Sequence, residues 1–211
     1  MSVREAKQEL VKVISDIVER TVLLEHDWDK FMYELDLVVD LFCDSLKIDV
    51  YELYERFPLI QSFYSVSLSL SDFSEFIKLL MNLSLFPGTS NYTKLYEFYN
   101  NEFYPRAYFI VSDFDDLSTY IKNNSDIEPY STAVLYLDSM ERHITNFATH
   151  LSDINSLISS LQTVVNSFIS SLGGGTKYSG TTYRKSGYRG GRSGYKKYGG
   201  SKKYSSYRRR R

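Results

Sequence analysis

The sequence contains a single cysteine, Cys43, among its 211 residues. One thiol excludes an intrachain disulfide and any zinc site built from several cysteines, and it is typical of a reducing compartment. The sequence also has no apolar run of the ~18 residues that a transmembrane helix needs. Its first ten residues, MSVREAKQEL, are too charged for a secretory signal, so we expect no cleavable signal peptide.

The segment 173–211 lacks acidic residues and also lacks Leu, Ile, Val, Phe and Met. It contains six Lys and seven Arg, a charge of +13, whereas residues 1–172 hold the other 12 cations and all 26 acids, a charge of −14. Without large apolar side chains, a segment cannot bury enough surface to offset its chain entropy. We therefore predict an acidic globular body over 1–172, about one domain in length, and a disordered basic tail over 173–211.

The N-terminal part of the body carries apolar residues at alternating steps of four and three, interrupted only by Thr21. This spacing keeps them on one face and predicts one long helix, or two nearly continuous ones, over about 3–46. The most expected break is at His26 and Asp27, because Asp27 can cap a second helix.

The C-terminal part of the body carries the same spacing without interruption from Ala133 to Leu172. It predicts a helix over about 129–172 that packs against other helices with a left-handed twist. The part 154–172 has no charged residue, which leaves three interpretations: it is covered by the body or by a second copy, it lies on a membrane surface, or it is an exposed face with few charges. We expect the first, with self-association through Ile144, Phe147, Leu151, Ile154, Ile158, Leu161, Val165, Phe168 and Leu172.

Shorter aromatic-rich helices are predicted between these two. Asp49 is expected to begin a helix that Pro58 ends. Asp72 and Glu75 have the spacing of a capping box, which predicts a helix that begins there and ends at Pro87.

Two further helices are expected, one ending at Pro105 and one beginning at Asp113. Residues 107–111 suit either a short strand or a buried helical turn. The predicted fold class is all-α: an elongated helical bundle with long N- and C-terminal heptad-patterned helices, followed by the disordered basic tail.

The tail places each of its seven tyrosines within three residues of a cation. The sequence Ser-Gly-Tyr-Arg at 186–189 returns as Ser-Gly-Tyr-Lys at 193–196, and 189–191 form an Arg-Gly-Gly triplet. This composition resembles the RGG/YGG-type tails of nucleic-acid-binding proteins. The resemblance covers 39 residues and is one of composition.

The physical chemistry of the tail leads to the same expectation. Cations neutralise phosphates and release counterions, and Tyr rings stack on unpaired bases. No rigid element is predicted there to present side chains to a groove, so binding would not depend on base sequence. The expected nucleic-acid-binding residues, for DNA or RNA, are Lys177, Tyr178, Tyr183, Arg184, Lys185, Tyr188, Arg189, Arg192, Tyr195, Lys196, Lys197, Tyr198, Lys202, Lys203, Tyr204, Tyr207, Arg208, Arg209, Arg210 and Arg211.

Two other partners suit a basic tail. It can attach to the acidic body of its own or a neighbouring copy, since charges of −14 and +13 attract. It can also bind anionic lipid, which recruits Lys and Arg clusters.

Sites for metals or catalysis are not indicated. His143 and His150 lie seven residues apart, but Asp153 is the only acid close to His150 in sequence. The acids Asp113, Asp115 and Asp116 are better explained by the start of a helix, whose dipole they complement. Glycines 173–175, followed by Thr and Lys, lack the order of a phosphate-binding loop. We expect no catalytic residues, no metal and no cofactor.

The sequence therefore favours a non-enzymatic, sequence-nonspecific nucleic-acid-binding structural protein that forms a homo-oligomer. Packaging roles of the nucleocapsid, virion or chromatin type suit this layout, with a location in the cytoplasm, on a nucleoid or chromatin, or within a virion. The alternative is a coiled-coil scaffold or membrane-surface protein that uses residues 154–172 and the tail on anionic lipid.

Overall fold

The computed structural model describes residues 2–82 and 89–173, nearly all of which are helical. No strand occurs in these two ranges, which confirms the all-α class for this part of the chain. The elements in chain order are α1 (Val3–Leu46), α2 (Val50–Arg56), α3 (Pro58–Asn82), α4 (Thr89–Phe98), a π-helical turn η1 (Tyr99–Phe103), α5 (Tyr104–Tyr108), α6 (Ile110–Asn123) and α7 (Tyr130–Gly173).

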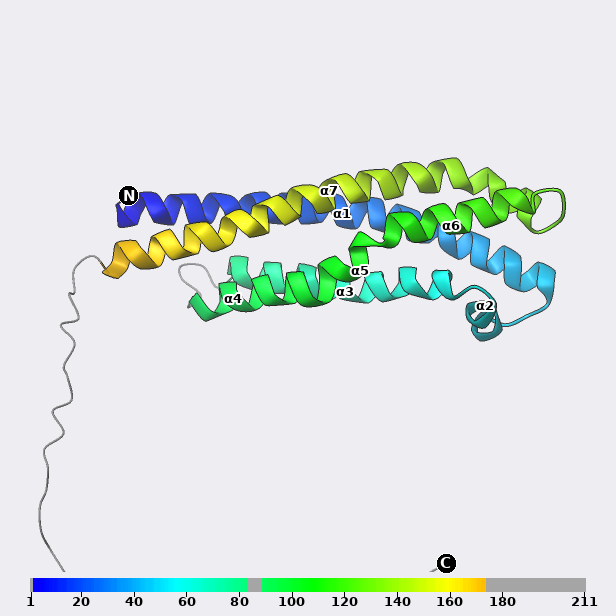
Figure 1. Ribbon diagram of the computed structural model, residues 1–211, viewed down its shortest axis with the longest axis horizontal. Helices are drawn as coiled ribbons and strands as arrows, with labels where there is room; N and C mark the ends of the chain where they lie inside the picture. The colour runs from blue at the N-terminus through cyan, green and yellow to red at the C-terminus, as the bar shows by residue number, and fades with distance from the viewer. Residues whose placement is uncertain (1, 83–88, 174–211) are drawn as a thin grey trace, which may run out of the picture. The chain divides into compact units, whose positions relative to one another are not determined.

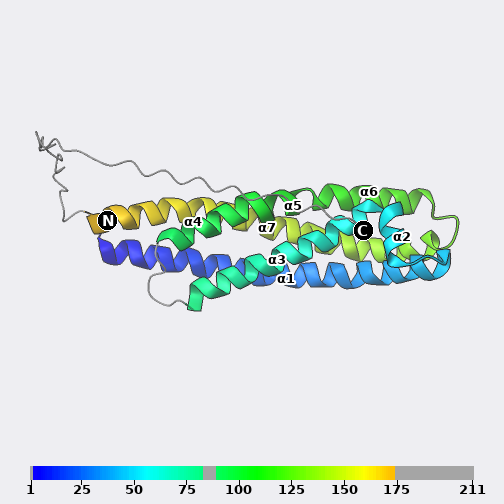
Figure 2. The same ribbon diagram turned by 90° about the horizontal axis from the view of Figure 1, so that it is seen from below.

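The two 44-residue helices, α1 and α7, lie side by side and run in opposite directions (Figures 1 and 2). Their four-three series face each other and are buried from Leu10 to Phe42 and from Ala133 to Phe168. Helices α3 to α6 pack against this pair and share its apolar core. Burying one apolar stripe of each helix supplies most of the stability of such long helices.

The expected break at Asp27 is wrong, because α1 continues through it without interruption. A cap would require the Asp27 carboxylate to accept from backbone N–H groups of its own helix. The carboxylate instead accepts from side chains of α7. Helix α1 begins at a capping box formed by Ser2 and Glu5 and ends at Lys47, whose φ of 58° is left-handed.

Helix α3 differs from its prediction at both Pro58 and Asp72. Pro58 begins this helix rather than only ending the one before it, since a proline is tolerated in a first turn. Asp72 is an exposed residue inside α3, not a cap. Apolar residues at steps of three and four continue past it from Ile60 to Leu80 and bury one face of the helix.

The region around Pro105 is also helical where an end was expected. The π turn η1 inserts an extra residue between α4 and α5, so that Pro105 falls at the start of α5, where no backbone N–H is needed. Residues 107–111 are helical except for a turn at Phe109, and none of them lies in a strand. Helix α6 begins at Ile110, before Asp113, whose Oδ2 accepts a hydrogen bond of 2.8 Å from Ser62 of α3.

Candidate functional site

The expected nucleic-acid-binding residues, from Lys177 to Arg211, lie outside the described residues. The predicted nucleic-acid interface and the predicted disorder of the tail therefore stay predictions. The described part of the chain nevertheless shows where the acids of residues 1–172 lie. In that part, Asp27 is the only acid that is buried, so the other described acids contribute to a negative surface.

The residues expected to mediate self-association lie mostly inside the core of one chain. Eight of the nine, from Ile144 to Phe168, are at most 7% exposed, and only Leu172 is exposed. They pack against α1 of the same chain, because its own four-three series supplies the complementary face. A face covered in this way is not free for a second copy, so self-association needs another surface.

The outer face of α7 between 154 and 172 is an exposed face with few charges. Its serines turn their hydroxyls back onto the helix; Ser159 and Ser170 donate to carbonyls four residues earlier at 2.9 and 2.8 Å. Most apolar side chains of this segment lie in the core, and Ile169 and Leu172 are exposed near its end, so a membrane surface would find no broad apolar face here. No helix in the described ranges is long and apolar enough to span a membrane.

A partly buried polar cluster joins α1 to α7 at the middle of their contact. Asp27 Oδ1 lies 3.0 Å from His143 Nδ1 and accepts from Asn146 at 3.2 Å, while Oδ2 lies 3.5 Å from His150 Nε2. Seven residues before Asp27 in α1, Arg20 pairs with Asp153 of α7 at 3.5 Å, and both side chains are more than 40% exposed. The cluster sets which residues of the two helices meet.

His150 meets Asp27 through one of its two ring nitrogens. Its Nδ1 is buried without a hydrogen-bond partner, so Nε2 is the nitrogen that faces the carboxylate. The two histidines contact different oxygens of one carboxylate, which is an arrangement that joins helices.

Sequence reasoning missed Asp27 as the partner of the two histidines. It placed Asp153 nearest to His150, but that residue pairs with Arg20 instead. The pairing could have been found by aligning the two long helices antiparallel. Seven residues after Arg20 in α1 comes Asp27, and seven residues before Asp153 in α7 comes Asn146, so the pair Arg20–Asp153 implies the pair Asp27–Asn146. A polar residue next to an apolar seam in one helix should then face polar residues in the other.

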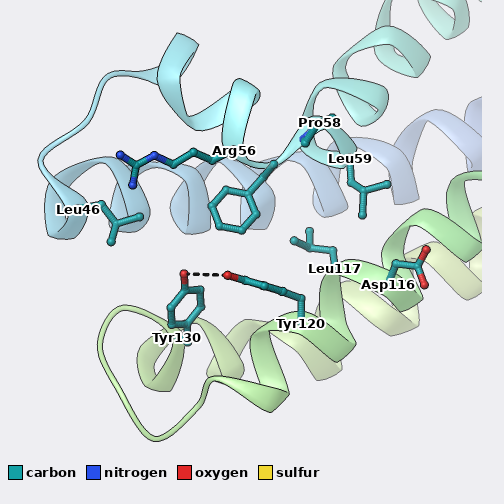
Figure 3. Close-up of a pocket in the computed structure, with 9 residues that line it drawn as sticks. Leu46, Arg56, Pro58, Leu59, Asp116, Leu117, Tyr120 and Tyr130 are labelled. Carbon is teal, nitrogen blue, oxygen red and sulfur yellow. Dashed lines mark hydrogen bonds between the residues drawn. The ribbon is translucent and has the colours of Figure 1, made fainter.

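A separate pocket of about 420 Å³ lies where the end of α1 meets α2, α6 and the start of α7 (Figure 3). Phe57, Leu117 and the rings of Tyr120 and Tyr130 form its walls, and the two tyrosine hydroxyls point toward each other at 3.5 Å. Burial, the hydrogen bond and the neighbouring Tyr120 together raise the pKa of Tyr130 to about 12. The Tyr130 phenol is therefore neutral near pH 7 and acts as a hydrogen-bonding group.

Alkaline pH is expected to destabilise the protein through this tyrosine. An unfolded Tyr has a pKa near 10, so the stability contributed by neutral Tyr130 is complete below about pH 10 and is lost between about pH 10 and 12. Burial also raises the pKa of Tyr64 and Tyr99. Urea unfolding at a series of pH values should show that the free energy of unfolding falls less between about pH 10 and 12 in Tyr130→Phe than in wild type. Tyr51→Phe, at a side chain 77% exposed, is the control, in which the free energy of unfolding should fall with pH as it does in wild type.

The three acids considered for a cation, Asp113, Asp115 and Asp116, lie near the start of α6, where Asp113 is engaged by Ser62. Within residues 2–82 and 89–173, no three His, Cys, Asp or Glu side chains are arranged to hold a metal ion. Comparison of the chain with protein-family models, with curated proteins and with solved structures found no match.

Proposed function

We propose that this protein is a non-enzymatic structural protein that binds nucleic acid without regard to sequence. The observation that carries the proposal is the division of charge: +13 over residues 173–211 and −14 over 1–172. Lys and Arg interleaved with Tyr provide phosphate neutralisation together with stacking surfaces for bases. A packaging role of the nucleocapsid, virion or chromatin type follows from this layout.

The helical body has a different task in this proposal. Its exposed acids repel phosphates, so nucleic acid is gripped by the tail and held away from the body. The proposal includes an elongated bundle built on heptad-patterned helices and a tail without fixed structure. The continuous apolar seam between α1 and α7 supports a rigid body of this kind.

Assembly of several bodies makes weak tails act together. Each linked tail adds a binding event at high effective concentration, so the affinity of an assembly exceeds that of one chain. Because the α7 seam is occupied within the chain, the assembly contact must use another surface or the tail itself.

Nucleic acid that copurifies with the intact protein tests the proposal. Protein purified at low salt is expected to carry nucleic acid that is released at high salt, and digestion with DNase or RNase identifies its type. Flotation with anionic vesicles, run in parallel, examines the membrane-surface alternative. A full-length chain that neither copurifies with nucleic acid nor binds added DNA or RNA at low salt would contradict the proposal.

A further inference from the structure

A groove of about 570 Å³, separate from the pocket of Figure 3, lies between α5, the start of α6 and the middle of α7. Most of its lining residues come from the stretch in which the chain turns from α5 into α6. Figure 1 shows this turn of the backbone beside α7. Tyr104, Tyr108 and Phe109 line one side, and Leu151 with Ala148 of α7 lines the other. Its volume falls in the range of ligand-binding pockets.

Two rings on the aromatic side of the groove are exposed. Tyr108 and Phe109 are each 60% exposed, although neighbouring Ala107 and Ile110 are 1% exposed. Their rings lie 5.3 Å apart, and Tyr108 lies 5.7 Å from Tyr104. These contacts hold the rings in place before any partner arrives, so ordering them costs a partner little.

The base of this aromatic side is fixed to the core. The ring of Tyr104 lies 5.5 Å from that of Tyr99, in the π turn η1. Tyr99 is fully buried, and its hydroxyl donates to the backbone carbonyl of Leu151 at 3.4 Å. The π turn thus positions the exposed rings against α7, and such turns are frequent at functional sites.

The charge of the groove selects the class of partner. Asp115, which is exposed, lies on its rim, and none of the residues lining it is Lys, Arg or His. Aromatic faces beside a carboxylate favour a guanidinium, which stacks on the ring while it pairs with the acid. The pocket of Figure 3 differs, because it has Arg56 in its lining.

We propose that this groove binds the Tyr- and Arg-bearing segment 177–211 of a neighbouring copy. That segment holds 13 cations and no acid, and it offers adjacent Tyr-Arg pairs at 183–184 and 188–189. The 38 residues from 174 to 211, which follow α7 and include this segment, span at most about 125 Å at ~3.3 Å each, enough to reach a second body. Its charge complements both the groove and the acidic body that carries the groove.

Other occupants fit the groove less well. A second copy of the body would be repelled, because each body carries a net charge of −14. In a symmetric contact, Asp115 of one copy would also face Asp115 of the other. Nucleic acid could stack on the rings, but its phosphates would meet the same carboxylate. The tail that grips nucleic acid in the proposed function is therefore also the element that links bodies when nucleic acid is absent.

Sedimentation of the nuclease-treated full-length protein tests this link. We expect association that rises with protein concentration at low salt and disappears at high salt. The double variant Tyr108→Ser/Phe109→Ser should weaken association at least tenfold, and Asp115→Lys should do the same by placing a cation on the rim. Tyr51→Ser, at an exposed tyrosine on α2, should leave association unchanged. All substitutions are at exposed positions, and circular dichroism checks that the helices remain.

Two results would overturn the inference: no association of the wild-type protein at low salt, or association that neither groove variant weakens. Binding of DNA measured at dilutions where single copies predominate should be equal in wild type and Tyr108→Ser/Phe109→Ser. A loss of self-association with unchanged DNA binding supports the groove whatever the biological role of the tail. An absence of DNA binding by the wild type contradicts the proposed function alone.

Discussion

Removal of residues 177–211 is expected to abolish tight binding to duplex DNA, with a loss of about 10⁴-fold or more at low salt. This segment holds all 13 tail cations, and the remaining body is acidic. If about 8 of the cations meet phosphates, the affinity of the full-length protein falls with salt at a slope near −7 in logarithmic units. Between about 50 and 200 mM salt, that slope also corresponds to about 10⁴-fold.

Filter-binding or gel-shift titrations of both proteins at several salt concentrations measure these quantities. A full-length variant in which the seven tail tyrosines are replaced by Ser is the matched control, because it keeps the charge and the length. Its slope on duplex DNA should equal that of wild type, while its affinity for single strands should fall by about 1–3 kcal/mol for each base that had stacked on a ring. An unchanged affinity after truncation would eliminate the proposed function.

Replacement of Asp27 by Ala is expected to lower the free energy of unfolding by about 3 kcal/mol. The substitution leaves His143, Asn146 and His150 without their common acceptor between α1 and α7. Removing the shared acceptor of such a cluster costs about this much, since His143 and His150 stay largely desolvated. For a chain of this size, the melting temperature should fall by about 6–12 °C.

Two further variants separate the cluster from a general effect of charge. Asp29→Ala removes an exposed acid from the same helix and should change stability by less than about 0.5 kcal/mol. Replacing Asp27, His143 and His150 together by Leu should recover much of the loss, because Asn146, the only partner that remains, is exposed and can bond to water. If Asp27→Ala unfolds at the same urea concentration as wild type, the cluster does not stabilise the contact between α1 and α7.

The two long helices could be predicted because their signal is periodic over many turns. The four-three series gave about 3–46 and 129–172, and the structure has Val3–Leu46 and Tyr130–Gly173. The middle of the chain was harder, since single residues there have more than one meaning. Pro58 can end one helix or begin the next, and Asp72 can cap a helix or lie on its exposed face. The role that each residue takes depends on which apolar side chains around it are buried in the core.

The candidate sites likewise divide into features that follow from the composition of the chain and features that follow from its tertiary contacts. The sequence alone determined the separation of acids from the basic segment and the helical periodicity of the body, because composition and spacing are properties of the chain itself. Only the tertiary structure decided that the α7 seam is covered by α1, that Asp27 meets two histidines, and that Tyr108 and Phe109 stay exposed. These three features depend on which helix faces meet. A four-three series of apolar residues can be covered by a helix of the same chain or by a helix of a second copy, so the spacing alone does not distinguish the two.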